Sequence, residues 1–160
     1  MKSLFNSCRI RLSFVALLAA AGGAHAAEPL RIGVPVGLSG ANSVVAPGVV
    51  QASQLAADEI NAAGGILGRQ IVLEIADDAS GAVGAQKAYD TLVFQKKVDA
   101  IIAMETSAAR NAALPIVSRG KVPYIYTSFY EGRSCNRWLH VYGWVPEQQV
   151  APGVDHWMKE

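Results

Sequence analysis

The strongest constraint on this chain is a regular alternation of strand-like and helix-like segments that begins at Leu30. Short apolar runs rich in Val and Ile alternate with longer stretches whose apolar residues recur at helical spacing. Strands that alternate with helices over short connections form parallel sheets with right-handed crossovers. The sequence therefore predicts the α/β class, as a doubly wound three-layer α/β/α parallel sheet. The expected strands are residues 30–36, 70–76, 98–103, 121–126 and 139–145.

The helices between these strands carry their own start and stop signals. The first is expected from about Val49, with polar residues such as Asn61 facing water. Gly64-Gly65 should end it, because glycine adopts the left-handed conformation without steric cost. A later helix, over 106–118, should kink or end early at Pro115, since proline has no N–H for a helical hydrogen bond. The expected apolar face of the first helix is Val49, Ala52, Ala56, Ile60 and Ala63.

The first 26 residues have the order of a secretory signal peptide. Basic residues precede an apolar run, Leu12–Ala21, that is too short to span a bilayer, and Ala24-His25-Ala26 supplies small residues for cleavage. An N-terminal membrane anchor is the alternative interpretation. Removing the segment also removes Lys2, Arg9 and Arg11, which lowers the formal net charge from +1 to −2. We therefore expect an exported mature chain of residues 27–160.

Composition and motif spacing exclude several classes of protein. A formal charge of +1 gives no basic surplus for binding nucleic acid. The spacing of His140 and His156 does not match a metal-binding motif, and Cys135 is the single cysteine after residue 26, so no metal site is expected. The glycines of Gly33-Val34-Pro35-Val36-Gly37 have the wrong spacing for a dinucleotide motif. We expect no cofactor, no metal and no nucleic-acid partner.

Three loops with small polar side chains follow expected strands, at residues 38–42, 104–107 and 127–131. In an open parallel sheet, ligands bind outside the carboxyl ends of the strands. Hydroxyl groups and helix N-terminal amides suit a small polar ligand, because they donate and accept hydrogen bonds without net charge. Tyr126, Phe129 and Tyr130 offer aromatic walls. The alternative is that the serines and threonines only cap helices.

One segment, Asp58–Arg69, resembles the EINAAGGIxGR signature of type I periplasmic solute-binding proteins of ABC transporters. The resemblance covers nearly all of the mature chain and implies a two-lobed receptor that delivers its solute to a permease in the inner membrane. Residues 27–160 would then be the N-terminal lobe only, with the second lobe missing from a truncated product. Further segments resemble the urea and short-chain-amide branch: Thr106–Arg110, Ala113–Pro115, Tyr130–Gly132 and Pro146–Gln149.

The resemblance also implies which loop residues contact the solute, which would be urea, a short-chain amide or an amino acid. Glu105 stands where the amide and urea branch usually has an aromatic residue. A carboxylate there would favour an ammonium-bearing solute if it faced the cleft, and it could equally point to solvent. No catalytic residue is expected. The expected ligand-binding residues are Ser39, Glu105, Thr106, Ser107, Thr127 and Tyr130.

Two functions of other classes are the alternatives. A small exported hydrolase would use Ser39 or Glu105 as its reactive group, but no histidine or lysine base occurs at a plausible loop position. The effector core of a cytosolic regulator would have the same fold, but it conflicts with a signal peptide and would need a segment that reads DNA. The sequence therefore favours a binding protein of the periplasm.

The order of the first 26 residues predicts processing between Ala26 and Ala27. N-terminal sequencing of the exported protein should start at Ala27. Exported material that begins at Met1 would contradict the signal peptide.

Overall fold

The computed structural model describes residues 27–132 and 134–159. The predicted signal peptide lies outside the described residues. Five strands form one sheet in the order β2-β1-β3-β4-β5, and every pairing is parallel. This confirms the predicted α/β class and its doubly wound sheet. The strands are β1 (Leu30–Val36), β2 (Ile71–Asp77), β3 (Ala100–Ala103), β4 (Tyr124–Tyr126) and β5 (Leu139–Val141).

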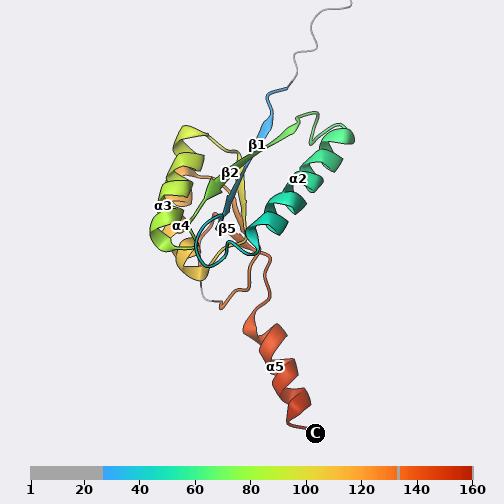
Figure 1. The fold of residues 1–160 in the computed structure, drawn as a ribbon, viewed down its shortest axis with the longest axis vertical. Coiled ribbons are helices and arrows are strands. Elements are labelled where there is room, and N and C mark those ends of the chain that lie inside the picture. The colour runs from blue at the N-terminus through green and yellow to red at the C-terminus, as the bar shows by residue number, and fades with distance from the viewer. Residues whose placement is uncertain (1–26, 133, 160) are drawn as a thin grey trace, which may run out of the picture.

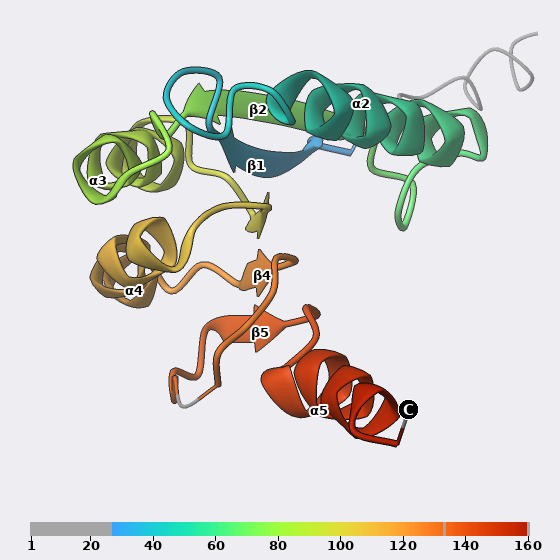
Figure 2. The ribbon, with the colours of Figure 1, turned by 60° about the horizontal axis from the view of Figure 1, so that its bottom comes forward.

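The helices form layers on the two faces of the sheet. Figure 2 shows α3 and α4 on one face and α2 on the other. The short π-helical segment η2 continues α3 directly. The strand order reverses at β1, because β2 lies on one side of it and β3 on the other. The helical elements are α2 (Ala46–Ala62), α3 (Ala82–Asp90), η2 (Thr91–Gln95), α4 (Ser107–Gly120) and α5 (Pro146–Trp157).

The hydrophobic core lies between the sheet and the α3–α4 layer. Tyr89 of α3 and Tyr124 of β4 are both fully buried, and their rings meet edge to face with centroids 5.4 Å apart. Such aromatic pairs add stabilisation beyond the area they bury. The rest of this core comes from the same layer and from the strands that face it: Ala85, Leu92, Val93, Val98, Ile101, Ala103, Ala109, Ala113, Val117, Val122 and Tyr126.

The opposite face is less completely covered. The predicted apolar face of α2 is directed toward the sheet, but Ala52, Ala56 and Ile60 line an open groove of about 320 Å³. Ala57 and Ala46 are the buried residues of this helix. Ala52, Ala56 and Ile60 are exposed and Ala63 follows the end of α2, so the spacing argument predicted the side of the helix that borders the sheet but not the residues that it buries.

Asn61 does not face water as predicted. Its side-chain amide donates to the carbonyl of Ile71 at 2.9 Å, and its side-chain oxygen accepts from the Ile71 N–H at 2.6 Å. Gly64 and Gly65 make this possible, because both have positive φ, 102° and 78°, and so turn the chain sharply after α2. Asn61 therefore fastens the end of α2 to the first residue of β2.

Helix α4 does not end early at Pro115. It continues to Gly120, and Lys121 ends it in the left-handed conformation with φ 56°. Pro115 lies on the exposed side of the helix, where the carbonyl that loses its partner can bind water.

Helix α5 extends away from the sheet (Figure 1) and none of its residues is buried. Val150, Val154 and Trp157 are all more than half exposed. Among the described residues, no helix has the length and apolar character needed to cross a membrane.

Replacing Asn61 with Ala should lower the free energy of unfolding by about 1–3 kcal/mol, because two backbone groups of Ile71 lose their partners. Gln51 is exposed on the same helix, and Gln51→Ala should change the free energy of unfolding by less than about 0.5 kcal/mol. Urea denaturation of both variants measures the difference. Equal stabilities would contradict the role given to Asn61.

Candidate functional site

The loops that follow β1, β3 and β4 meet at one edge of the sheet and enclose a pocket of about 480 Å³, called here the edge pocket. Because the strands are parallel, these loops all lie at the carboxyl edge, where open α/β sheets bind ligands. The switch in strand order at β1 leaves room between its loop and the loop after β3. The edge pocket is lined by Asn42, Val45, Met104, Glu105, Thr106, Ser107, Tyr126, Thr127, Ser128 and Phe129.

The N-terminus of α4 forms one wall of this pocket. Thr106 is its N-cap, and the Thr106 hydroxyl accepts from the Ala109 N–H at 3.2 Å. The capping alternative therefore holds for Thr106. The Ser107 hydroxyl donates to Glu131 Oε2 at 2.9 Å. The first N–H groups of a helix have no acceptor within the helix, so this wall presents hydrogen-bond donors and a partial positive charge.

The loop after β4 forms the facing wall. Thr127 extends the pairing beyond β4, since its N–H and its hydroxyl both donate to the Ala103 carbonyl, at 2.9 and 3.0 Å. Gly143 supports this loop from behind, because a Cβ at residue 143 would lie 1.5 Å from the Ser128 carbonyl oxygen. Phe129 is 72% exposed and contributes an apolar surface at the mouth.

A charged pair ties this loop to α4. Arg110 is 1% exposed, and its Nη1 and Nη2 donate to the Glu131 carboxylate at 3.1 and 2.6 Å. Its guanidinium also lies over the rings of Tyr126 and Tyr130, 4.9 and 5.0 Å from their centroids. The Arg110 hydrogen bonds lower the pKa of Glu131 to about 2. Glu131 therefore stays ionised and is held against the start of α4.

Two of the predicted contact residues lie outside the edge pocket. Ser39 is exposed, and its hydroxyl donates to Asp77 Oδ2 at 2.7 Å, so it joins the loop after β1 to the end of β2. Tyr130 borders a neighbouring pocket beside Trp144 and Pro146. Its hydroxyl accepts from the Ser134 N–H at 2.6 Å. The structure therefore brings together Glu105, Thr106, Ser107 and Thr127, without Ser39 and Tyr130.

Glu105 faces neither the cleft nor solvent with its carboxyl group. The residue is 4% exposed, and Oε1 accepts hydrogen bonds from the hydroxyls of Tyr89 at 2.8 Å and of Tyr124. Burial raises the pKa of Glu105 to about 8, and the two tyrosine hydrogen bonds only partly oppose this shift. A carboxylate available to an ammonium group is therefore not present in the edge pocket at neutral pH.

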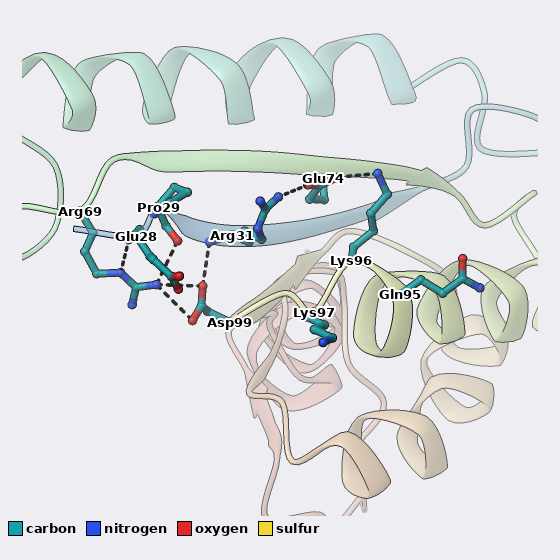
Figure 3. Close-up of a pocket in the computed structure, with 9 residues that line it drawn as sticks. All are labelled: Glu28, Pro29, Arg31, Arg69, Glu74, Gln95, Lys96, Lys97 and Asp99. Atoms are coloured by element: carbon teal, nitrogen blue, oxygen red, sulfur yellow. Dashed lines mark hydrogen bonds and ion pairs between the residues drawn. The ribbon is translucent and has the colours of Figure 1, made fainter. Parts of the chain in front are cut away.

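A second pocket, of about 580 Å³, lies at the opposite edge of the sheet, near the amino ends of the strands. Figure 3 shows Arg31 and Lys96 converging on Glu74, at 2.7 and 3.3 Å. Arg69 binds Asp99 at 3.2 Å and the carbonyls of residues 28 and 29. Two cations share Glu74 and a third pairs with Asp99, and the arrangement joins β1, β2 and the start of β3. It is a structural network of ion pairs.

Comparison with known proteins gives the family. Residues 29–160 match the family model described as periplasmic binding protein. The chain belongs to the periplasmic binding protein family. Among curated proteins, it is 46% identical over 67 residues to the Leu/Ile/Val-binding protein BraC3 of Rhizobium johnstonii, covering 42% of this chain and 18% of that protein.

Solved structures agree with this family. The isoleucine complex of LivJ, a branched-chain amino acid transporter substrate-binding protein of Streptococcus pneumoniae, is 31% identical with a TM-score of 0.61, over 71% of this chain and 33% of that one. The leucine-binding protein LivK of Thermotoga maritima is 26% identical with a TM-score of 0.66, over 78% and 35%. The present periplasmic binding protein thus spans about a third of these structures. The relatives are binding proteins, not enzymes, and they do not support the hypothesis of an exported hydrolase.

Sequence reasoning missed how the edge pocket is supported. Val45 lines the pocket although it precedes a helix expected only from about Val49. Arg110 and Glu131 both stand in segments singled out by the sequence resemblance, but their pairing depends on the approach of residues 21 positions apart. Within the described part of the chain, no group of three or more His, Cys, Asp or Glu side chains is placed to hold a metal ion.

Glu131→Gln should lower the free energy of unfolding at pH 7 by about 1–2 kcal/mol. The loss is smaller than for a fully buried pair, because the Glu131 side chain is 52% exposed and water screens it. The lowered pKa of Glu131 stabilises the fold above pH 4.5, and this contribution is lost as the pH falls toward about 2. The difference between wild type and variant should therefore shrink over that range.

Urea denaturation at several pH values measures this difference. Glu147→Gln is the matched control, because Glu147 is exposed at the start of α5. This variant should have nearly the same free energy of unfolding as the wild type. A wild-type advantage over Glu131→Gln that stays constant down to about pH 2 would contradict the assignment.

Proposed function

We propose that this periplasmic binding protein is the solute-binding component of an ABC transporter and that its edge pocket holds one end of a branched-chain amino acid. The observation that carries the proposal is the meeting of the α4 N-terminus with the Ser107 and Thr127 hydroxyls in one pocket at the switch point of the sheet. Relatives named for leucine, isoleucine and valine support this class of solute.

The polar wall suits the carboxylate of an amino acid. Free N–H groups at a helix N-terminus, together with the helix dipole, favour an anion. Ser107 and Thr127 each donate their hydroxyl proton to the protein, to Glu131 and to Ala103, so their oxygens are left to accept a hydrogen bond from the ammonium group of the solute, beside the carboxylate at the helix N–H groups. We propose Thr106, Ser107 and Thr127 as the solute-contacting residues of this lobe.

The apolar wall suits an aliphatic side chain. Val45, Met104 and Phe129 are exposed at the pocket, at 43%, 39% and 72%. Burying these surfaces against a hydrocarbon chain is favourable by roughly 25 cal/mol per Å². Urea or a short amide would leave them wet. For that reason we place an aliphatic amino acid ahead of the urea and amide solutes that the sequence resemblance suggested.

Residues 1–26 would direct export to the periplasm, and residues 27–160 would form the first lobe of the receptor. A second lobe would close over the edge pocket, exclude water and present the loaded receptor to the permease. One lobe alone leaves the solute half enclosed, so its hydrogen bonds exchange with water at little net gain. Affinity of the single lobe should therefore be weak.

Titrating the isotopically labelled 160-residue chain with isoleucine, and separately with urea, tests this proposal by NMR. Isoleucine should shift the amide signals of Thr106, Ser107 and Thr127, with a dissociation constant of about 1 mM or weaker. Ser107→Ala should weaken binding several-fold. Lys97→Ala, in the pocket at the opposite edge, is the control and should leave binding unchanged.

Isoleucine-induced shifts confined to the opposite edge would contradict the site. Stronger shifts with urea than with isoleucine would contradict the solute class. Micromolar affinity for the single chain would show that a second lobe is not needed for tight binding.

A further inference from the structure

Beneath the edge pocket lies a buried cluster that the proposed function does not use. It consists of the carboxyl groups of Asp78 and Glu105 and the hydroxyls of Tyr89 and Tyr124. Asp78 is 0% exposed and Glu105 4%. The four residues come from the loop after β2, the loop after β3, helix α3 and strand β4. The cluster therefore joins elements on both sides of the switch point.

In each carboxyl group, one oxygen accepts a hydrogen bond from a backbone N–H or a tyrosine hydroxyl, and the other oxygen does not. Asp78 Oδ1 accepts from the Ser80 N–H at 2.7 Å, and Glu105 Oε1 accepts from both tyrosine hydroxyls. Asp78 Oδ2 and Glu105 Oε2 are buried without a donor. A side-chain hydrogen bond with the other residue is among the causes that lower the pKa of Asp78 and raise the pKa of Glu105, which makes Glu105 the donor. Two ionised carboxylates offer only acceptors, so a direct hydrogen bond between them requires a proton.

In the described part of the chain, the groups that act on the pair include no cation. The titratable groups that face it are Tyr89 from α3, Tyr124 from β4 and Asp77 at the end of β2. Arg110, the buried cation among the described residues, binds the Glu131 carboxylate. Two like charges in a low-dielectric site repel strongly, whereas one proton turns the repulsion into a hydrogen bond.

We propose that Asp78 and Glu105 hold one proton between their carboxyl groups, and that this neutral acid and its carboxylate partner position the loops after β2 and β3 under the edge pocket. The proton sits on Glu105 Oε2 and is donated to Asp78 Oδ2. The shared proton does not depend on the proposed function. Only the effect of the proton on solute contacts rests on that function.

The backbone connections of the two residues explain how the pair positions the pocket. The Glu105 carbonyl accepts from the Tyr126 hydroxyl at 3.1 Å, and the next residue, Thr106, caps α4. The Asp78 N–H donates to the Val36 carbonyl at 3.2 Å, which ties the loop to the end of β1. Loss of the proton to solvent would leave two adjacent carboxylates and push these loops apart. Glu105 is thus a positioning residue.

Proton linkage tests this arrangement without any solute. The unfolded chain releases the Glu105 proton above its ordinary pKa of 4.5, whereas the folded pKa is about 8. The folded state therefore holds more protons in this range, and its stability falls as the pH rises. Because of Glu105, the unfolding equilibrium constant of the 160-residue chain should increase by up to about tenfold per pH unit between about pH 5.5 and 7.5.

Two glutamine variants isolate the group. Glu105→Gln keeps a donor toward Asp78 and an acceptor for the tyrosines but has no proton to release, so the pH dependence should lose this contribution. Glu59→Gln, at an exposed position of α2, should follow the wild type. Amide signals of Thr106 and Thr127 should also titrate with a midpoint near pH 8 in the wild type and not in Glu105→Gln.

A Glu105→Gln variant with the same pH dependence as the wild type would overturn the proposal. If that variant does not fold, Asp78→Asn and the infrared carbonyl band of the wild type decide the matter. A protonated-carboxyl band at pH 7 that disappears in Asp78→Asn supports the shared proton, because an asparagine amide can donate to an ionised Glu105. A wild type without such a band at pH 7 overturns it. A failed solute titration leaves these results unaffected.

Discussion

All the strand pairings in this sheet are parallel, so the chain leaves every strand at the same edge. That constraint brings the loops after β1, β3 and β4 together although they are far apart in sequence. Because β2 and β3 flank β1 on opposite sides, the helices that follow β1 and β3 lie on opposite faces. The loops consequently separate at β1 and leave the edge pocket open. Hydroxyls, helix N-terminal amides and apolar side chains all reach this one place.

Holding polar loops at that edge requires buried charge and hydrogen bonds, and the protein uses two different arrangements. Arg110 is fully buried but its carboxylate partner, Glu131, is half exposed, so the pair remains ionised. Asp78 and Glu105 are both buried with no cation between them, and we infer that a proton takes the place of the cation. Each arrangement joins a loop to an element on the other side of the pocket.

The fold and the edge were predictable from sequence, because strand and helix periodicity and the handedness of parallel crossovers are local rules. The groups that Thr106 and Ser107 contribute were found for the same reason. The direction of the Glu105 side chain was not predictable, since it depends on Tyr89 and Tyr124, which approach it only in the folded sheet. Asn61 was assigned to solvent for a similar reason: its partner, Ile71, follows a turn whose geometry is set by paired glycines.

The central claim is that the edge pocket is where this lobe holds its solute. A crystal structure of the chain with a saturating concentration of isoleucine tests it most directly. The account predicts the isoleucine carboxylate at the first N–H groups of α4, its ammonium group within hydrogen-bond distance of the Ser107 or Thr127 hydroxyl oxygen, and its aliphatic chain against Val45, Met104 or Phe129. Isoleucine bound among the ion pairs at the opposite edge, with the edge pocket filled only by water, would contradict it.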